Sequence, residues 1–229
     1  RLLHYARNDK NMFRNSKFIT ILEESKTVST VSYDNSYDSK RRFVSYWHQI
    51  REVLQRDPER VLEVGIGNGF VSRYLRSRGL ELATVDNEAE LKPDVVADIT
   101  ALPFTDEAFD VVTAYEVLEH MPYEKSLAGL RELARVSSQW VLVSLPDATH
   151  AFRVAVTIPR VGYVQKVVTF PHIFSRTHPY AKSHTWEIGI RNYPVSRIMN
   201  DMRLAGFNLV SSYRIYENPY HRFFVLQKK

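Results

Sequence analysis

The stretch Glu63-Val64-Gly65-Ile66-Gly67-Asn68-Gly69 decides the fold of this 229-residue chain. It follows a short apolar run, Arg60–Val64, and apolar residues at helical spacing come after it. A strand that ends in a Gly-x-Gly-x-Gly loop and opens a helix lets a ligand approach the backbone closely, because glycine tolerates the tight turn. The loop therefore predicts a nucleotide-type site at the edge of a sheet.

The third glycine of the loop separates two kinds of nucleotide site. A dinucleotide site would have Gly-x-Gly-x-x-Gly, but position 70 is Phe70 and the third glycine is Gly69. Glu63 lies inside the predicted strand, where a carboxylate is costly unless it meets a cation. A pyrophosphate would be repelled there, whereas S-adenosylmethionine (SAM) brings an ammonium and a sulfonium. The residues therefore favour SAM over a nicotinamide dinucleotide.

A second carboxylate, Asp86, ends the next predicted strand. It lies 21 residues after Gly65, close to the spacing of about 20 residues at which an acidic side chain binds the hydroxyl pair of a ribose. Only the seven residues 87–93 separate Asp86 from Asp94, where another strand is predicted to begin. A parallel crossover normally needs a dozen or more residues, so this one is predicted to be a loop or a single turn.

Strands and helices alternate outward from the loop. Predicted strands cover residues 60–64, 81–86, 94–99, 109–114 and 139–145, and predicted helices cover 70–78 and 123–136. This alternation indicates a parallel sheet with helices on both faces. After a predicted helix over 195–205, the last two strands are predicted over 207–216 and 222–227. Their order indicates an antiparallel hairpin at the end of the parallel sheet.

The residues before the first strand predict helical structure. A helix is predicted from Ser39 to Gln55, and its apolar spacing indicates one buried face formed by Phe43, Trp47, Ile50 and Leu54. A further short helix is predicted near Ile19–Ser25.

The same organisation suggests how the chain is divided. We expect residues 1–57 to form an N-terminal helical or lid segment and residues 58–229 to form a ligand-binding domain. Within that domain, residues 146–194 show no clear period and are predicted to be an irregular insertion on the acceptor side. The whole is expected to be one compact unit.

An ordered set of motifs resembles the class I SAM-dependent methyltransferases. The stretch from Val61 to Gly69 resembles motif I of that family. The next motifs follow in the family's order at Val85-Asp86, Ala97-Asp98-Ile99, Phe109-Asp110-Val111-Val112, Glu116-Val117-Leu118-Glu119-His120 and Arg131–Val136. The resemblance is close over residues 58–147 and looser beyond. It implies a three-layer, Rossmann-like α/β methyltransferase fold with a mostly parallel seven-stranded sheet and a C-terminal antiparallel hairpin.

The resemblance also implies a cofactor and the residues that bind it. The cofactor is SAM, with S-adenosyl-L-homocysteine as its product. Glu63 is expected near the methionine ammonium, and Asp86 at the ribose hydroxyls with Asn87 beside it. Asp98 is expected to face the adenine amino group, and Ile99 to cover the ring. The remaining implied contacts are Gly65, Gly67, Asn68 and Gly69 along the backbone, and Tyr115 and Glu116 near the methionine arm.

Two histidines are candidate catalytic residues on the acceptor side. His120 follows the fourth predicted strand, and His184 begins the run His184-Thr185-Trp186-Glu187, which resembles a segment close to the active site of relatives. His184 could act as a general base or contact the acceptor. Each could equally be structural, His184 as a hydrogen-bonded residue and His120 as a helix cap. The spacing of the histidines matches no standard ligand pattern, so we predict no metal site.

The composition of the chain excludes several kinds of site and bears on its expected location. The chain has no cysteine, which excludes disulfides, thiolate metal sites and a cysteine nucleophile. No stretch reaches the roughly 18 uncharged apolar residues of a membrane span, and the sequence does not begin with the apolar core of a signal peptide. We therefore expect no transmembrane segment and a cytoplasmic location.

The net charge of the last third of the chain bears on which kind of methyl acceptor it can bind. Residues 151–229 carry 12 Lys and Arg against 3 Asp and Glu, a net +9, which attracts anions, although a solvated basic surface has the same count. The sequence thus predicts a SAM-dependent methyltransferase with an unidentified small-molecule or headgroup acceptor, for which an anionic group is allowed. The alternatives are an RNA- or protein-directed methyltransferase, without any nucleic-acid motif to support it, and a nicotinamide-dependent oxidoreductase. The oligomeric state is left open.

Overall fold

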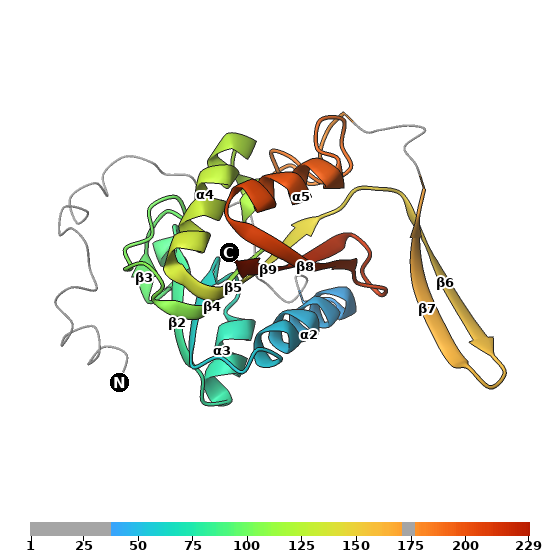
Figure 1. Ribbon diagram of the computed structural model, residues 1–229, viewed down its shortest axis with the longest axis horizontal. Helices are drawn as coiled ribbons and strands as arrows, with labels where there is room; N and C mark the ends of the chain where they lie inside the picture. Colours follow the sequence, from blue (N-terminus) through green and yellow to red (C-terminus); the bar gives the residue numbers. More distant parts are fainter. Residues whose placement is uncertain (1–37, 171–176) are drawn as a thin grey trace.

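The computed structural model describes residues 38–170 and 177–229, and within them seven strands form one sheet in the order β3-β2-β1-β4-β5-β9-β8 (Figure 1). The strands are β1 Arg60–Val64, β2 Glu81–Asp86, β3 Val95–Val96, β4 Phe109–Tyr115, β5 Ser137–Pro146, β8 Phe207–Arg214 and β9 His221–Lys228. The first five run parallel, and β9 is antiparallel to both β5 and β8. This confirms the predicted mostly parallel sheet with a C-terminal antiparallel hairpin.

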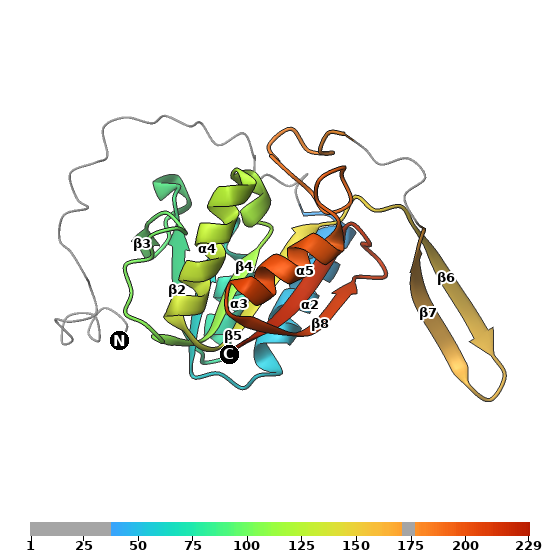
Figure 2. The same cartoon turned by 45° about the horizontal axis from the view of Figure 1, so that its top comes forward.

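Helices cover both faces of the sheet and make three layers (Figures 1 and 2). One face carries α4 (Tyr123–Val136) and α5 (Val195–Leu204), and the other carries α2 (Lys40–Leu54) and α3 (Phe70–Ser77). The alternation of side chains along β1 shows why two cores form. Val61 packs in the core beneath α2 and α3, whereas Leu62 and Val64 pack in the core beneath α4 and α5.

The predicted buried face of α2 is wrong for Phe43, Trp47 and Leu54, although Ile50 packs against the core. Trp47 is 56% exposed and Phe43 is 45% exposed, while Tyr46 and Val53 are buried. The face that packs on the sheet also holds polar residues, because partners on the sheet satisfy them: Glu52 accepts a 2.7 Å hydrogen bond from the Tyr213 hydroxyl. Apolar spacing alone cannot reveal a polar residue that is buried with a partner.

The short crossover after β2 is a single turn, as predicted. It contains the 3-10 turn η2 (Ala89–Leu91) and leads into β3, which has only two residues rather than the six predicted. The Asp94 carboxylate accepts 2.8 Å hydrogen bonds from the Thr84 backbone amide and hydroxyl. These bonds hold the returning chain against β2 without a helix.

Part of the predicted irregular insertion is regular. β6 (Ala151–Ile158) and β7 (Gly162–Thr169) pair antiparallel as a separate ribbon, here called the arm, which projects from the body in both views (Figures 1 and 2). Its turn contains Arg160 at a φ of 67°. The prediction of irregular structure was wrong, because large apolar residues alternate along β6, at Phe152, Val154, Val156 and Ile158, with smaller or polar ones. This period of two is typical of a strand, although both faces of the ribbon are exposed.

Two sequence-based expectations fall on residues 1–37, which lie outside the described part of the chain: the short helix near Ile19–Ser25 and most of the N-terminal segment. The division at residues 57 and 58 stays a prediction. Among the described residues, no helix is both long enough and apolar enough to cross a membrane.

Candidate active site

The glycine loop lies at the carboxyl ends of β1, β2 and β4, where the order of the strands reverses. The chain runs outward from β1 to β3 and then returns to the other side of β1 as β4. In open α/β sheets, ligands bind in the crevice at such a point. The Gly65 amide donates a 2.8 Å hydrogen bond to the Val85 carbonyl, which ties the loop to the end of β2.

Gly65 has to be glycine for two reasons. Its φ is +82°, a conformation that is strained for residues with a side chain. A Cβ at this position would lie 2.3 Å from Cγ2 of Val117, far inside contact distance. Val117 belongs to the segment after β4, so two segments from adjacent strand ends meet closely at the loop.

Glu63 is buried at the end of β1, with only 5% of its surface exposed. Its Oε2 atom has no hydrogen-bond partner. Burial raises the pKa of Glu63 to about 8, although the Ser72 hydroxyl and the guanidinium of Arg76 work in the other direction. A cation placed here would favour the ionised carboxylate.

Asp86 is placed at the end of β2 as predicted, and it also shapes the loop. Its Oδ2 accepts a 2.9 Å hydrogen bond from the Ile66 amide and its Oδ1 accepts a 3.0 Å bond from the Glu88 amide. The side-chain oxygen of Asn68, which lies just before α3, accepts a 3.1 Å bond from the amide of Phe70, the first residue of that helix. Asn87 is exposed beside Asp86.

Asp98 and Ile99 follow β3 at the same edge of the sheet. The Lys125 ammonium donates a 2.8 Å hydrogen bond to Asp98. Burial works to raise the pKa of Asp98, but Lys125 and Thr100 outweigh it and lower the pKa. Ile99 is buried against Gly129 and Leu118. The adenine contacts expected of Asp98 and Ile99 stay predictions.

Tyr115 and Glu116 end β4 and differ in their surroundings. The Tyr115 side chain packs in the core beneath α2, where its hydroxyl donates a 3.2 Å bond to the Gln49 carbonyl. Glu116 has a φ of +55°, its Oε1 is buried without a partner, and its Oε2 lies 3.7 Å from Nε2 of His221. The role of each toward SAM stays a prediction.

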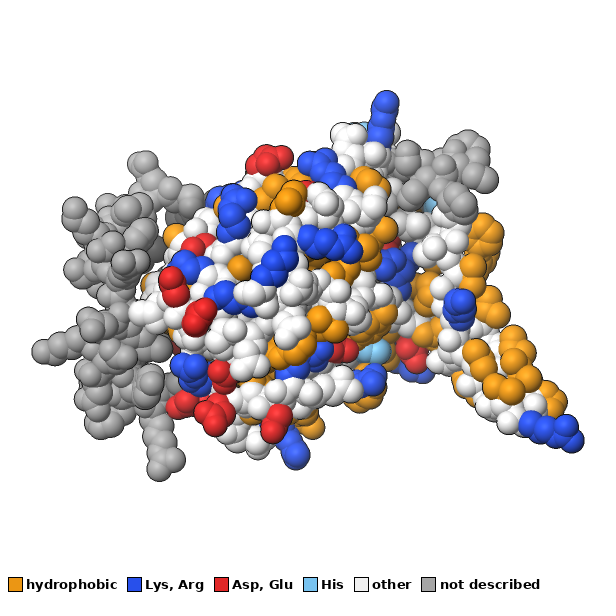
Figure 3. Space-filling model, in the orientation of Figure 1, with side chains coloured by type: hydrophobic (Ala, Val, Ile, Leu, Met, Phe, Trp, Pro, Cys, Tyr) orange, Lys and Arg blue, Asp and Glu red, His pale blue; other side chains and the backbone are white. Residues whose placement is uncertain are grey.

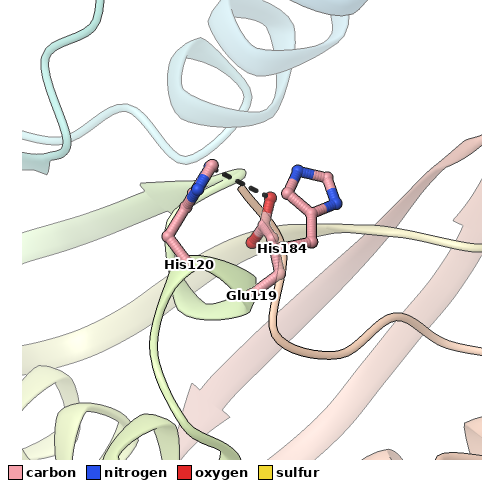
Figure 4. A group of neighbouring side chains, drawn as sticks. All are labelled: Glu119, His120 and His184. Carbon is pink, nitrogen blue, oxygen red and sulfur yellow. Dashed lines mark ion pairs between the residues drawn. The ribbon is translucent and has the colours of Figure 1, made fainter. Parts of the chain in front are cut away.

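The structure brings the two candidate histidines together although they are 64 positions apart (Figure 4). His120 ends the 3-10 turn η3 (Leu118–His120), and its ring centre lies 4.9 Å from that of His184. Burial lowers the pKa of His120, and His184 adds to this effect. Glu119 completes the group and has no exposed surface. Burial raises the pKa of Glu119 well above its usual range, and Glu116 adds to it.

Two acidic residues of this group were missed from the sequence. Glu119 was noted only as part of a family motif, and Glu187 only as the end of the run that begins at His184. Glu187 accepts hydrogen bonds from the His184 ring at 2.8 Å and the Tyr220 hydroxyl at 2.7 Å. Burial works to raise the pKa of Glu187, but these bonds outweigh it and lower the pKa. The close acidic pair Glu116 and Glu119 was the available signal.

The residues at the loop fit SAM. A buried carboxylate with a free oxygen and a raised pKa suits the ammonium of a methionine group, and it disfavours pyrophosphate. The positive φ angles of Gly65, Gly67 and Gly69 give the tight turn that lets a ligand lie against the backbone.

Comparison with known methyltransferases supports SAM as the ligand of the glycine loop. A demethylmenaquinone methyltransferase of Thermus thermophilus is 28% identical over 159 residues, which are 58% of this chain and 70% of that protein. A family model described as a methyltransferase domain matches residues 62–139. This match runs from β1 through the glycine loop to β5, and it includes both Glu63 and Asp86. Residues 62–139 form a methyltransferase domain, and the chain is a SAM-dependent methyltransferase.

Solved structures show that the methyltransferase has the fold of this family. The Burkholderia thailandensis 1,6-didemethyltoxoflavin-N1-methyltransferase, solved with S-adenosylhomocysteine, superposes with a TM-score of 0.52 at 15% identity, covering 82% of this chain and 86% of that one. The CcbJ methyltransferase of Streptomyces caelestis superposes with a TM-score of 0.56 at 14% identity, covering 87% of this chain and 100% of that one.

The methyltransferase domain identifies SAM as the cofactor but does not identify the acceptor. SAM supplies an activated methyl group to the methyltransferase, and the protein chiefly aligns the acceptor and excludes water. The alternative of a nicotinamide-dependent oxidoreductase is thereby set aside. What distinguishes this methyltransferase must lie on its acceptor edge, here defined as the carboxyl ends of β4 and β5 with the segments that follow them.

Proposed function

We propose that this methyltransferase acts on the headgroup of an amphipathic small molecule, which it meets at a lipid surface contacted by the arm. The arm carries the proposal, because it leaves the acceptor edge directly after β5 and exposes apolar side chains.

The apolar character of the arm is its most unusual feature (Figure 3). A two-stranded ribbon alone is marginally stable in water, so a second surface would stabilise it. Its contacts to the body include Arg153, whose guanidinium lies 5.9 Å from the ring centre of Tyr216. Its exposed large apolar residues are Phe152, Val154, Val156, Ile158, Val161, Tyr163, Val164, Val168 and Phe170.

The charge of the arm suits an anionic lipid surface. Arg153, Arg160 and Lys166 lie between residues 151 and 170, and no acidic residue does. Each cation near such a surface contributes about 1 kcal/mol, and complete burial of one Val, Ile or Phe side chain contributes about 1.5–3 kcal/mol. With nine apolar side chains against three cations, apolar contact dominates.

The same balance weakens the RNA-directed alternative. A β-ribbon can enter a nucleic-acid groove, but binding there rests on cations that neutralise phosphates. The arm has only three cations beside nine exposed apolar side chains. This composition favours contact with an apolar phase over contact with the phosphates of a nucleic acid.

A cavity at the base of the arm is the candidate headgroup site. Its volume is about 250 Å³, and Asp147, Thr149, His150, Tyr180, Arg214 and Tyr220 are among the residues that line it. Glu187 joins the cavity to the histidine pair, since its carboxylate accepts bonds from the Tyr180 amide, the Tyr220 hydroxyl and His184. An acceptor in the cavity would therefore be close to His184.

The charges nearest this cavity favour an uncharged headgroup over the anionic one that the basic last third allowed. Asp147 is fully buried between two cations: Arg222 donates a 2.7 Å bond to it, and Arg214 lies 3.7 Å away. Asp147 balances only one of these two cations, but Glu116, Glu119 and Glu187 lie on the same edge, so carboxylates outnumber the remaining cation. The named acceptors of similar methyltransferases, a menaquinone precursor and a toxoflavin precursor, are small molecules.

Transfer of a radioactive methyl group identifies the acceptor class. The protein is incubated with methyl-labelled SAM and with organic-solvent extracts, aqueous extracts, RNA or protein from cells. We expect label in material from the organic extract. Label in RNA or protein alone would overturn the proposal, and label in water-soluble compounds alone would remove its lipid part.

Sedimentation with vesicles tests the arm separately. The vesicles contain phosphatidylcholine with a minority of phosphatidylglycerol. Val156→Ser combined with Tyr163→Ser should release the protein from them, whereas Thr157→Ser on the same strand should not. Apolar contact predicts that much of the binding survives high salt, which screens charges. Binding that is equal for all variants, or dimerisation through the arm without vesicle binding, would contradict this role.

A further inference from the structure

Glu119 is a buried carboxylate without a hydrogen-bond partner, and its Oε1 lies 4.0 Å from Nε2 of His120, the contact dashed in Figure 4. It has no exposed surface, and neither of its oxygens accepts a hydrogen bond from another residue. A carboxylate in this position is costly unless it is paired or bound to a metal. The residue expected at the SAM ammonium is Glu63, so Glu119 calls for an explanation of its own.

The two histidines beside Glu119 are held in a particular way. Nδ1 of His184 lies 2.8 Å from Oε1 of Glu187, and Nδ1 of His120 lies 3.2 Å from the Ser183 carbonyl. When Nδ1 donates to such an acceptor, Nε2 is left with a free lone pair. This is the arrangement of metal-binding histidines, whose second nitrogen donates to a carboxylate or carbonyl.

We propose that Glu119, His120 and His184 bind a divalent metal ion of the zinc class on the acceptor edge. Two imidazoles and one carboxylate are the three protein ligands of one type of catalytic zinc site, which leaves a further position open. Glu187 and the Ser183 carbonyl orient the two imidazoles from behind.

The geometry of the group suits such an ion. The ligand atoms of the three residues lie within 4.8 Å of one another, and small movements would bring them to the zinc distances of about 2.0–2.2 Å. Figure 4 shows the three side chains converging from η3 and from the segment around His184. The His120 side chain is 39% exposed, so the open position of the ion would face the solvent side.

The ion would have a place in the proposed function. Glu187 bonds to His184 and Glu116 lies three positions before Glu119, so a dication would add positive charge where acidic residues gather. Its open position could hold an oxygen of the headgroup beside the cavity. This last step rests on the proposed function, but binding of the ion does not.

The prediction of no metal site relied on spacing along the chain. His120 and Glu119 are adjacent, and His184 comes 64 positions after His120, a separation that no local ligand pattern describes. Only the return of the chain from β5 to η3 brings them together, where Thr185 donates a 2.8 Å backbone bond to the Glu119 carbonyl.

Calorimetric titration with Zn²⁺, without SAM or any acceptor, tests the site. The purified chain is stripped with a chelator, and binding of Co²⁺ is followed in parallel by its visible absorption. We expect one tight site that places Co²⁺ in a low-symmetry environment. Glu119→Gln and His184→Ala should each weaken binding at least tenfold, and His178→Ala, an exposed histidine outside the group, should leave it unchanged.

The affinities of the variants for Zn²⁺ decide whether the proposed metal site exists. Equal affinity of the wild-type protein, Glu119→Gln and His184→Ala, or no Zn²⁺ binding by a folded wild-type protein, would overturn the proposal. Circular dichroism establishes that each variant is folded. If His184→Ala does not fold, His184→Gln takes its place. Because neither SAM nor acceptor is present, failure of this site and failure of the proposed acceptor class are separate results.

Discussion

The Ile66 amide donates a 2.9 Å hydrogen bond to Oδ2 of Asp86. One carboxylate thus holds the glycine loop in shape and stands where a ribose is expected. Oδ1 of Asp86 accepts a second backbone bond, from Glu88. The conformation of the loop and the position of the residue expected to contact SAM are therefore set by the same side chain.

Replacement of Asp86 should affect stability and cofactor binding together. Hydrogen bonds to a charged group contribute about 1.5–3 kcal/mol each, and Asp86→Ala removes two. We expect a loss of about 2 kcal/mol or more in urea unfolding and at least tenfold weaker SAM binding. Glu90→Ala, at an exposed acidic residue of η2, is the control. A variant as stable as the control would contradict the role of these bonds.

Replacement of Glu63 should change stability and SAM binding in opposite directions. Glu63→Gln removes a buried carboxylate whose Oε2 is unpartnered, so the melting temperature of the protein without ligand should rise at pH 8. SAM binding should weaken roughly 10- to 100-fold, as expected for loss of a hydrogen bond between charged groups. Thermal shift with and without SAM measures both, with the exposed Glu81→Gln as control. Unchanged stabilisation by SAM would exclude Glu63 as its ammonium partner.

The same residue should make cofactor binding depend on pH. Burial raises the pKa of Glu63 from 4.5 to about 8, so the folded protein keeps a proton that the unfolded chain releases. The stability contribution of Glu63 therefore falls as pH rises from about 4.5 to 8. A bound ammonium favours the ionised form, so SAM affinity should rise by up to about tenfold per pH unit below 8. In Glu63→Gln this slope should disappear, and persistence of the slope would assign it to another group.

Two glycines with positive φ should respond differently to alanine. At Gly65, a Cβ would meet Val117 at 2.3 Å, whereas at Gly79 (φ +90°) no atom lies within 4 Å. Gly79→Ala should cost about 1–2 kcal/mol, the backbone term alone. Gly65→Ala should cost about 2–5 kcal/mol because overpacking adds to it, and it should also impair SAM binding. Equal losses in the free energy of unfolding by urea would show that the Val117 side chain moves aside without strain.

The centre of the fold could be predicted from the sequence because local signals there agree. The glycine loop, the acidic residues at strand ends and the alternation of elements each point to one parallel sheet. Glu63 was the most informative residue, since a charged carboxylate buried in a strand is costly unless a cation pairs with it. The structure places it at the switch point with a free oxygen.

The parts that could not be predicted depend on distant contacts. The buried face of α2 includes Glu52, whose partner Tyr213 is 161 positions away. The arm is a different case, because the alternation of apolar residues along β6 was a local signal, and only its projection from the body could not be read from the sequence. The grouping of Glu119, His120 and His184 exists only after β5 and the later segment have packed against η3. The buried face of α2 and this grouping each depend on pairing across the fold, which local periodicity does not contain.

The central claim is that the glycine loop, Glu63 and Asp86 form a SAM site. Calorimetric titration of the intact chain with S-adenosylhomocysteine at pH 8 tests it most directly. The account predicts one binding site per chain and much weaker binding by Glu63→Gln. A folded wild-type protein that gives no binding heat with either S-adenosylhomocysteine or SAM, at several temperatures, would contradict it.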